Sequence, residues 1–117
     1  QCLVAPDARL KQVYPGFYPR GHTPDLIRNE LVIAPEELPA PENFTGAAAG
    51  CGTAFVEQMP DSLQQSLATV DIPLMVDAKA MLGIALKAWQ NGETIAAEDA
   101  EPAYVRTEIT WKKIDQQ

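Results

Sequence analysis

Residues 77–92, which read DAKAMLGIALKAWQNG, carry the strongest structural pattern of the chain. Asp77 is a good N-cap, and Asn91-Gly92 ends a helix in the usual left-handed way, so we predict a helix over 77–91. One face of that helix collects the apolar residues Ala78, Met81, Leu82, Ala85, Ala88 and Trp89. This stripe is most simply core, and it is an interface only if the tertiary structure leaves it uncovered.

The residues upstream of this helix are typical of strands. Residues 3–5 are short and apolar, and 11–18 are rich in β-branched and aromatic residues but interrupted by Pro15 and Pro19. A third segment, 26–33, ends in an apolar run. Because the links between them are short, we expect a three-stranded antiparallel meander whose second strand is an edge strand or is bulged.

Helices and strands alternate over the rest of the chain. We expect, in order, a short helix between Pro35 and Pro39, a small-residue strand in 44–49, a helix from a Thr53 cap to about Met59, a helix over 62–67 and a weak strand in 69–74. Strands followed by alternating helices and strands indicate an α/β fold. The order matches a ribonuclease-H-like subdomain, with an extended tail over 93–117.

Composition limits what the chain can be. Its 117 residues make one domain at most, and 46% hydrophobic residues argue against disorder. No apolar run approaches the ~20 residues of a membrane span, so we expect a cytoplasmic protein without membrane contact. The net charge of −7 disfavours direct binding to a phosphate backbone. The chain opens directly on an apolar strand, and we expect a domain taken from a longer protein.

The two cysteines, Cys2 and Cys51, lie far apart in the sequence. They could pair, but we interpret them as small buried thiols in a reducing cytosol. Neither has a Cys or His at ligand spacing, and His22 is the only histidine, so we expect no metal site of this kind. His22 lies in a turn-rich loop, where a catalytic role is disfavoured.

Two other segments could carry chemistry. Asp7 follows the first strand, and a metal-dependent hydrolase would need it to converge with acids such as Glu30, Asp71 or Asp77. We favour a turn in which Asp7 accepts backbone hydrogen bonds and Arg9 is solvated or paired.

The second segment is Gly50-Cys51-Gly52-Thr53, which precedes an expected helix. The amides of Gly50 and Gly52 could contact a phosphate, because the N-terminus of a helix attracts anions. A single Gly-x-Gly is weak evidence for this, since glycine serves any tight turn. We favour a structural turn and expect no cofactor in this domain.

Three segments resemble the TsaB/YeaZ family in the order in which that family carries them. They are the Asp-Ala-Arg of 7–9, the Gly-x-Gly of 50–52, and a C-terminal part made of 77–85, 92–93, the Ala-Glu-Pro-Ala-Tyr-Val-Arg of 100–106 and the Trp-Lys-Lys-Ile of 111–114. The C-terminal part is the specific one. The resemblance implies the C-terminal half of a two-subdomain protein of the actin-like, ribonuclease-H-like superfamily.

The same resemblance implies a function. It predicts a non-catalytic scaffold that binds TsaD-like and TsaE-like proteins during threonylcarbamoyladenosine modification of tRNA. The tRNA would be met only indirectly, ATP or ADP and metal would belong to the partner assembly, and a homodimer of the full-length protein is possible. The alternatives are a metal-dependent ribonuclease-H-like hydrolase and a glycoprotease-type peptidase.

This sequence departs from the complete family pattern. The N-terminal half with its Gly-Pro-Gly-Ser-Phe-Thr-Gly signature is absent, and 44–46 reproduces only the Phe-Thr-Gly end of it. Within the C-terminal tail we expect Tyr104 and Arg106 to organise the segment. Arg106 has a planar fork of donors that suits a backbone carbonyl or a carboxylate, and Glu101 or Asp7 are the candidate carboxylates.

Overall fold

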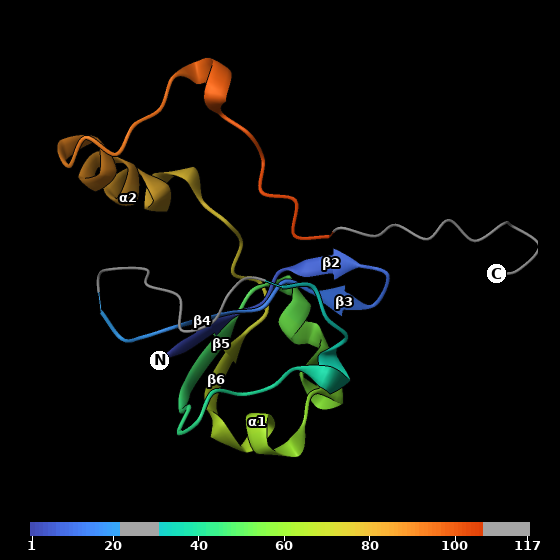
Figure 1. Cartoon of the computed structure of the whole chain (residues 1–117). Helices are drawn as coiled ribbons and strands as arrows, with labels where there is room; N and C mark the ends of the chain where they lie inside the picture. Colours follow the sequence, from blue (N-terminus) through green and yellow to red (C-terminus); the bar gives the residue numbers. More distant parts are fainter. Residues whose placement is uncertain (22–30, 107–117) are drawn as a thin grey trace, which may run out of the picture.

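A computed structural model describes residues 1–21 and 31–106 of the chain. Its centre is a four-stranded mixed sheet in the order β4-β1-β5-β6 (Figure 1). Strand β1 (Cys2–Val4) pairs antiparallel with β4 (Gly16–Tyr18) and parallel with β5 (Gly46–Ala49), which pairs parallel with β6 (Leu67–Asp71). With its helices, this sheet makes an α/β fold, as the sequence predicts.

A separate hairpin leads from β1 to β4. Strand β2 (Asp7–Arg9) pairs antiparallel with β3 (Gln12–Val13), so the single strand expected over 11–18 is divided into β3 and β4. The division falls at Tyr14 and Pro15, and proline cannot donate a hydrogen bond to a sheet ladder. Residues 7–9 thus form a strand as well as the start of a turn.

The predicted meander is present in part. Its first pair is the antiparallel pairing of β1 with β4. Residues 26–30 of the predicted third strand lie outside the described residues. At its end, Ile33 forms an antiparallel bridge with Val13, with N–O distances of 2.9 and 3.1 Å.

Three short helical elements cover one face of the sheet. The 3₁₀ helix η1 (Pro35–Glu37) begins with proline at its first position, as predicted, and α1 (Asp61–Ser66) lies close to the helix expected at 62–67. Between them, η2 (Cys51–Gln58) is a 3₁₀ helix in which Thr53 is not the N-cap. The expected Thr53 cap is wrong because Gly50 takes that position with a φ of 105°.

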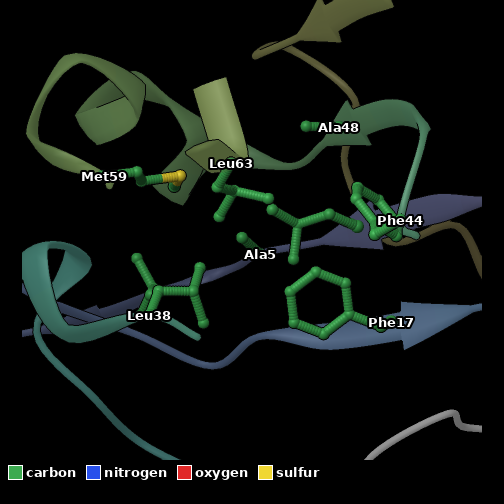
Figure 2. Close-up of a cluster of buried hydrophobic side chains, with 9 residues drawn as sticks. Ala5, Phe17, Leu38, Phe44, Ala48, Met59 and Leu63 are labelled. Atoms are coloured by element: carbon green, nitrogen blue, oxygen red, sulfur yellow. The ribbon is translucent and has the colours of Figure 1, made fainter. Parts of the chain in front are cut away.

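The hydrophobic core lies between these helices and the sheet. Figure 2 shows side chains from both layers pointing at one another, with Phe17 on the sheet side and Leu38, Met59 and Leu63 on the helical side. The Phe17 and Phe44 rings meet edge to face, and their centroids lie 5.0 Å apart. Leu3, Leu38 and Leu63 are fully buried, and each such side chain contributes about 2 kcal/mol through burial.

Helix α2 (Ala78–Gln90) lies within one residue of the predicted bounds at each end, but it does not pack as predicted. The Asp77 carboxylate accepts the Lys79 amide at 2.9 Å. At the other end Gly92 has a φ of 75° and its amide bonds to Trp89, while the Glu93 amide reaches Ala88 at 2.9 Å. This pair of bonds is a Schellman ending.

None of the α2 residues is buried, and Figure 1 shows the helix well apart from the sheet, with the 3₁₀ helix η3 (Ala97–Asp99) beyond it. The expectation that the α2 stripe is core is therefore wrong for this chain. The sheet and the short helices already close the core without it. Over the part of the chain that the structure describes, none of the helices has the length and apolarity to cross a bilayer.

Candidate site beneath the C-terminal tail

The chain after α2 returns to the sheet and borders an open hollow of about 580 Å³. Its walls come from the end of β1, from the β3–β4 link and β4, and from the tail. The lining residues are Val4, Pro6, Tyr14, Pro15, Gly16, Tyr18, Ala103, Tyr104, Val105 and Arg106. Aromatic rings and prolines dominate this list, so the hollow suits an apolar or flat group bordered by a few polar atoms.

Arg106 fixes the tail over this hollow. One terminal nitrogen, Nη2, donates to the carbonyl oxygen of Ala8 at 3.1 Å. The contact joins the tail to β2 across nearly the whole length of the chain. Among the partners considered from the sequence, the structure selects a backbone carbonyl next to Asp7 rather than a carboxylate. Tyr104 is 80% exposed at the rim, and Glu101 is exposed.

Asp7 is engaged locally. One oxygen of its carboxylate accepts the Arg9 amide at 2.8 Å, and the other lies 3.7 Å from the Arg9 guanidinium. The Asp7 amide donates to the sulfur of Cys51 at 3.4 Å. These contacts are those of a turn in which the Asp7 side chain orders its own backbone.

The other described acids form no metal-binding group with Asp7. In the ranges 1–21 and 31–106, no three His, Cys, Asp or Glu side chains lie together as a metal site requires. The Asp77 carboxylate caps α2, and Asp71 contributes its backbone carbonyl to the Gly50 amide. Glu30 and His22 fall outside the described residues.

The Gly50–Gly52 turn uses its amides internally. The Gly50 amide donates to Asp71 at 3.0 Å, and the Gly52 amide donates to Ala5 at 2.8 Å. The carbonyl oxygen of Gly50 accepts from both the amide and the hydroxyl of Thr53. A phosphate at this turn would have to displace these bonds, so the geometry favours the structural turn.

Gly52 is required by close packing. A Cβ at this position would lie 2.6 Å from the carbonyl oxygen of Ala5 and 2.8 Å from a methyl carbon of Val13. The turn therefore places η2 directly against the end of β1. Both glycines carry a role in fold geometry that their spacing alone could not distinguish from ligand binding.

Cys2 and Cys51 are free thiols of intermediate burial. Burial raises the pKa of the Cys2 thiol. A raised pKa keeps the sulfur protonated near neutral pH, and the protonated form is a poor nucleophile. Cys51 accepts the backbone hydrogen bond from the Asp7 amide.

The sequence pattern does not reveal the residues that line the hollow. It predicts Tyr14 and Tyr18 to be strand residues and does not connect them to Tyr104, about 90 residues later. Only the return of the tail to β2 brings them together. The break at Pro15 was the available signal, because it turns the chain and leaves an irregular surface between β3 and β4.

The chain was compared with family profiles, curated proteins and solved structures. No family profile matches the chain. The tRNA threonylcarbamoyladenosine biosynthesis protein TsaB of Escherichia coli K12 is 32% identical over 117 residues, covering 96% of this chain and 50% of TsaB.

Two structures from Pseudomonas aeruginosa share the fold. An uncharacterised protein with similarity to peptidase YeaZ is 34% identical with a TM-score of 0.79, covering 90% of this chain and 49% of that protein. YeaZ itself is 34% identical with a TM-score of 0.75, covering 88% and 49%. The resemblance seen in the sequence is confirmed, and the chain spans about half the length of these relatives.

Proposed function

We propose that this chain, a partial TsaB/YeaZ domain, serves the biosynthesis of threonylcarbamoyladenosine in tRNA as a non-catalytic scaffold. The observation that carries the proposal is the 32% identity to E. coli TsaB across almost the entire chain. Residues 1–117 would form one ribonuclease-H-like domain that corresponds to the C-terminal half of such a protein.

The scaffold role is supported by how the candidate chemical groups are used. The Asp7 carboxylate orders its own turn, the Gly50 and Gly52 amides bond within the fold, and the Cys2 thiol has a raised pKa. Each group is engaged or deactivated where a catalyst would need it free. Nucleotide and metal, where the assembly uses them, would then be held by TsaD-like and TsaE-like partners.

The acidic character of the chain agrees with an indirect contact to RNA. With a net charge of −7, this domain repels a phosphate backbone unless a partner supplies the basic surface. Recognition of tRNA would therefore be the work of the assembly. The metal-dependent hydrolase lacks comparable support, because no group of three or more metal-donor side chains stands among the described residues. The peptidase has no observation in its favour.

A chimera tests this function. This chain replaces the matching half of E. coli TsaB, and the hybrid is expressed in cells depleted of their own TsaB. The expected result is restored threonylcarbamoyladenosine in total tRNA, measured by nucleoside mass spectrometry. A folded hybrid at normal abundance that restores none of the modified nucleoside would contradict the proposal.

The scaffold role needs a second measurement. Purified hybrid is mixed with E. coli TsaD and TsaE, and the complexes are followed by light scattering. We expect the hybrid to enter a complex and to form no modified nucleoside without its partners. A hybrid that modifies tRNA alone, or that binds neither partner, would rule out the scaffold.

A further inference from the structure

The Asn91-Gly92 junction at the end of α2 combines a reactive sequence with an exposed position. Of the three asparagines in the chain, Asn91 is the one that a glycine follows. The amide of a glycine attacks a preceding asparagine side chain readily, because the missing Cβ leaves its nitrogen accessible and its backbone free to turn. Both residues are exposed, so water reaches them. The junction therefore has the composition of a spontaneous deamidation site.

Deamidation at such a junction consumes only water. The Gly92 nitrogen loses its proton to a base in the solvent and attacks the side-chain carbonyl carbon of Asn91. A new C–N bond forms, the bond to Nδ2 breaks, and Nδ2 takes up a proton and leaves as ammonia. Water then opens the resulting succinimide ring at either carbonyl carbon, which yields aspartate or isoaspartate. No atom is oxidised or reduced, and residue 91 gains a negative charge.

The folded end of α2 withholds the attacking nitrogen. The Gly92 amide donates to the carbonyl oxygen of Trp89 at 3.1 Å, and the Glu93 amide donates to that of Ala88 at 2.9 Å. These two bonds form the Schellman ending of the helix. A hydrogen-bonded amide proton is lost to solvent base only after its bond opens. The attacking form of the Gly92 nitrogen is therefore not available while the helix end is intact.

The conformation of Asn91 also withholds the carbon that would be attacked. Ring closure requires the Cβ of Asn91 to eclipse the Gly92 nitrogen across the Cα–C bond. Asn91 has a ψ of −5°, so its own backbone nitrogen takes the eclipsed position and its Cβ is rotated away. The side chain is held as well, because Nδ2 donates to the Glu93 carboxylate at 3.1 Å. Helical geometry at Asn91 and ring closure are therefore mutually exclusive.

This protection is only as stable as the helix. No residue of α2 is buried, so the helix can unwind without disturbing the core. A helix of this length is marginal in water, and such elements open far more often than a whole fold does. Each opening frees the Gly92 amide and releases the ψ angle of Asn91. We propose that Asn91-Gly92 is a deamidation site that the folded end of α2 keeps closed and that reacts when the helix unwinds.

The products oppose refolding of the helix end. The Asn91 side chain now donates to Glu93, and an aspartate there would place a second carboxylate beside that of Glu93. Both negative charges lie at the C-terminus of the helix, where the helix dipole disfavours them. Isoaspartate lengthens the backbone by a carbon atom, which moves the Gly92 amide out of line with Trp89. Deamidation thus turns a reversible opening into a permanent one.

The test measures deamidation in the tryptic peptide 88–106, whose one asparagine is Asn91. The 117-residue chain and a synthetic peptide of residues 88–106 are incubated side by side at mildly alkaline pH. Mass spectrometry then quantifies aspartate and isoaspartate at residue 91. We expect the chain to react about tenfold more slowly than the peptide, because its amide is free only in the open helix. Equal rates would overturn the proposal.

A matched pair of variants ties the rate to helix opening. Ala85→Gly weakens α2 and should speed deamidation of the chain about fivefold, whereas Gly83→Ala strengthens α2 and should slow it by a similar factor. Both positions lie in the helix interior, outside the core, and nothing lies near the Cβ position of Gly83. The proposal is wrong if the two variants deamidate at the same rate.

Asn91→Asp tests whether the product keeps the helix open, because it creates one deamidated side chain directly. It should lower helical circular dichroism relative to Asn91→Gln, which keeps a neutral amide on a side chain that closes a ring far more slowly. Equal helicity of the two variants would contradict a permanent opening. None of these measurements involves tRNA modification, so the proposed function and this inference stand or fall separately.

Discussion

The sharpest local strain in the described residues lies in the β2–β3 turn. Arg9, Leu10 and Lys11 have φ values of 64°, 53° and 57°, so three successive residues with side chains adopt the left-handed conformation. A residue with a Cβ costs about 1–2 kcal/mol in the left-handed conformation relative to the right-handed one. Leu10 gains nothing from packing to offset this, because it is 72% exposed.

We predict that Leu10→Gly stabilises the chain by about 1 kcal/mol, since relief of strain exceeds the extra entropy of glycine in the unfolded state. Urea unfolding followed by circular dichroism measures the change. Leu10→Ala removes the same exposed apolar group but keeps the strain, so it should gain less. A glycine variant no more stable than the alanine variant would show that the turn is not strained.

Gly52 is predicted to be intolerant of any side chain. Gly52→Ala places a Cβ against the Ala5 carbonyl and Val13, which should cost about 1–3 kcal/mol as η2 shifts from the sheet. Gly83→Ala is the control, because nothing lies near its Cβ position and alanine favours the helix. Thermal unfolding should separate the two, and equal melting temperatures would contradict the packing at Gly52.

At the scale of elements, α2 depends on its own ends. We predict that Asp77→Ala lowers helical circular dichroism of the isolated chain through loss of about 1 kcal/mol of capping, while global unfolding changes little. The body should not respond, because no residue of α2 is buried. Asp77→Asn keeps a good cap and should retain the helix. A large fall in global stability with Asp77→Ala would indicate that α2 packs on the body.

At the scale of the whole molecule, the tail closes the fold. The bond from the Arg106 guanidinium to the Ala8 carbonyl oxygen joins the C-terminal tail to the β2–β3 hairpin. We predict that Arg106→Ala costs about 1 kcal/mol and speeds hydrogen exchange over 100–106. Arg106→Lys tests the need for the planar fork and should recover only part of the protection. If Arg106→Ala leaves both the hydrogen exchange rates over 100–106 and the free energy of unfolding unchanged, Arg106 does not hold the tail.

The same scale explains why the candidate site escaped sequence reasoning. The hollow beneath the tail exists because the tail places Tyr104 beside a surface that Tyr14 and Tyr18 line from the other end of the chain. Local patterns report neighbours three or four residues apart on a helix or two apart on a strand. They carry no information about a contact that spans nearly a hundred residues.

The sequence by itself determined those helices whose start and end depend on residues close by in the chain. The N-cap Asp77, the left-handed Gly92 and the helix-starting Pro35 act on backbone groups within a few residues, so α2 and η1 appear where their patterns place them. The α/β class follows from the same local signals. Residues 100–106 likewise carry the family resemblance in their own order.

Tertiary structure alone decided which apolar surfaces become core. Leu38 and Leu63 are buried because they join Phe17 and Leu3 in one cluster between the short helices and the sheet. The stronger apolar pattern of α2 is not buried by any surface that the described residues provide. An apolar surface is buried only when another surface covers it. The sequence pattern shows that a helix has an apolar face, but not which surface covers that face. Whether that surface lies within these 117 residues is a property of the folded whole.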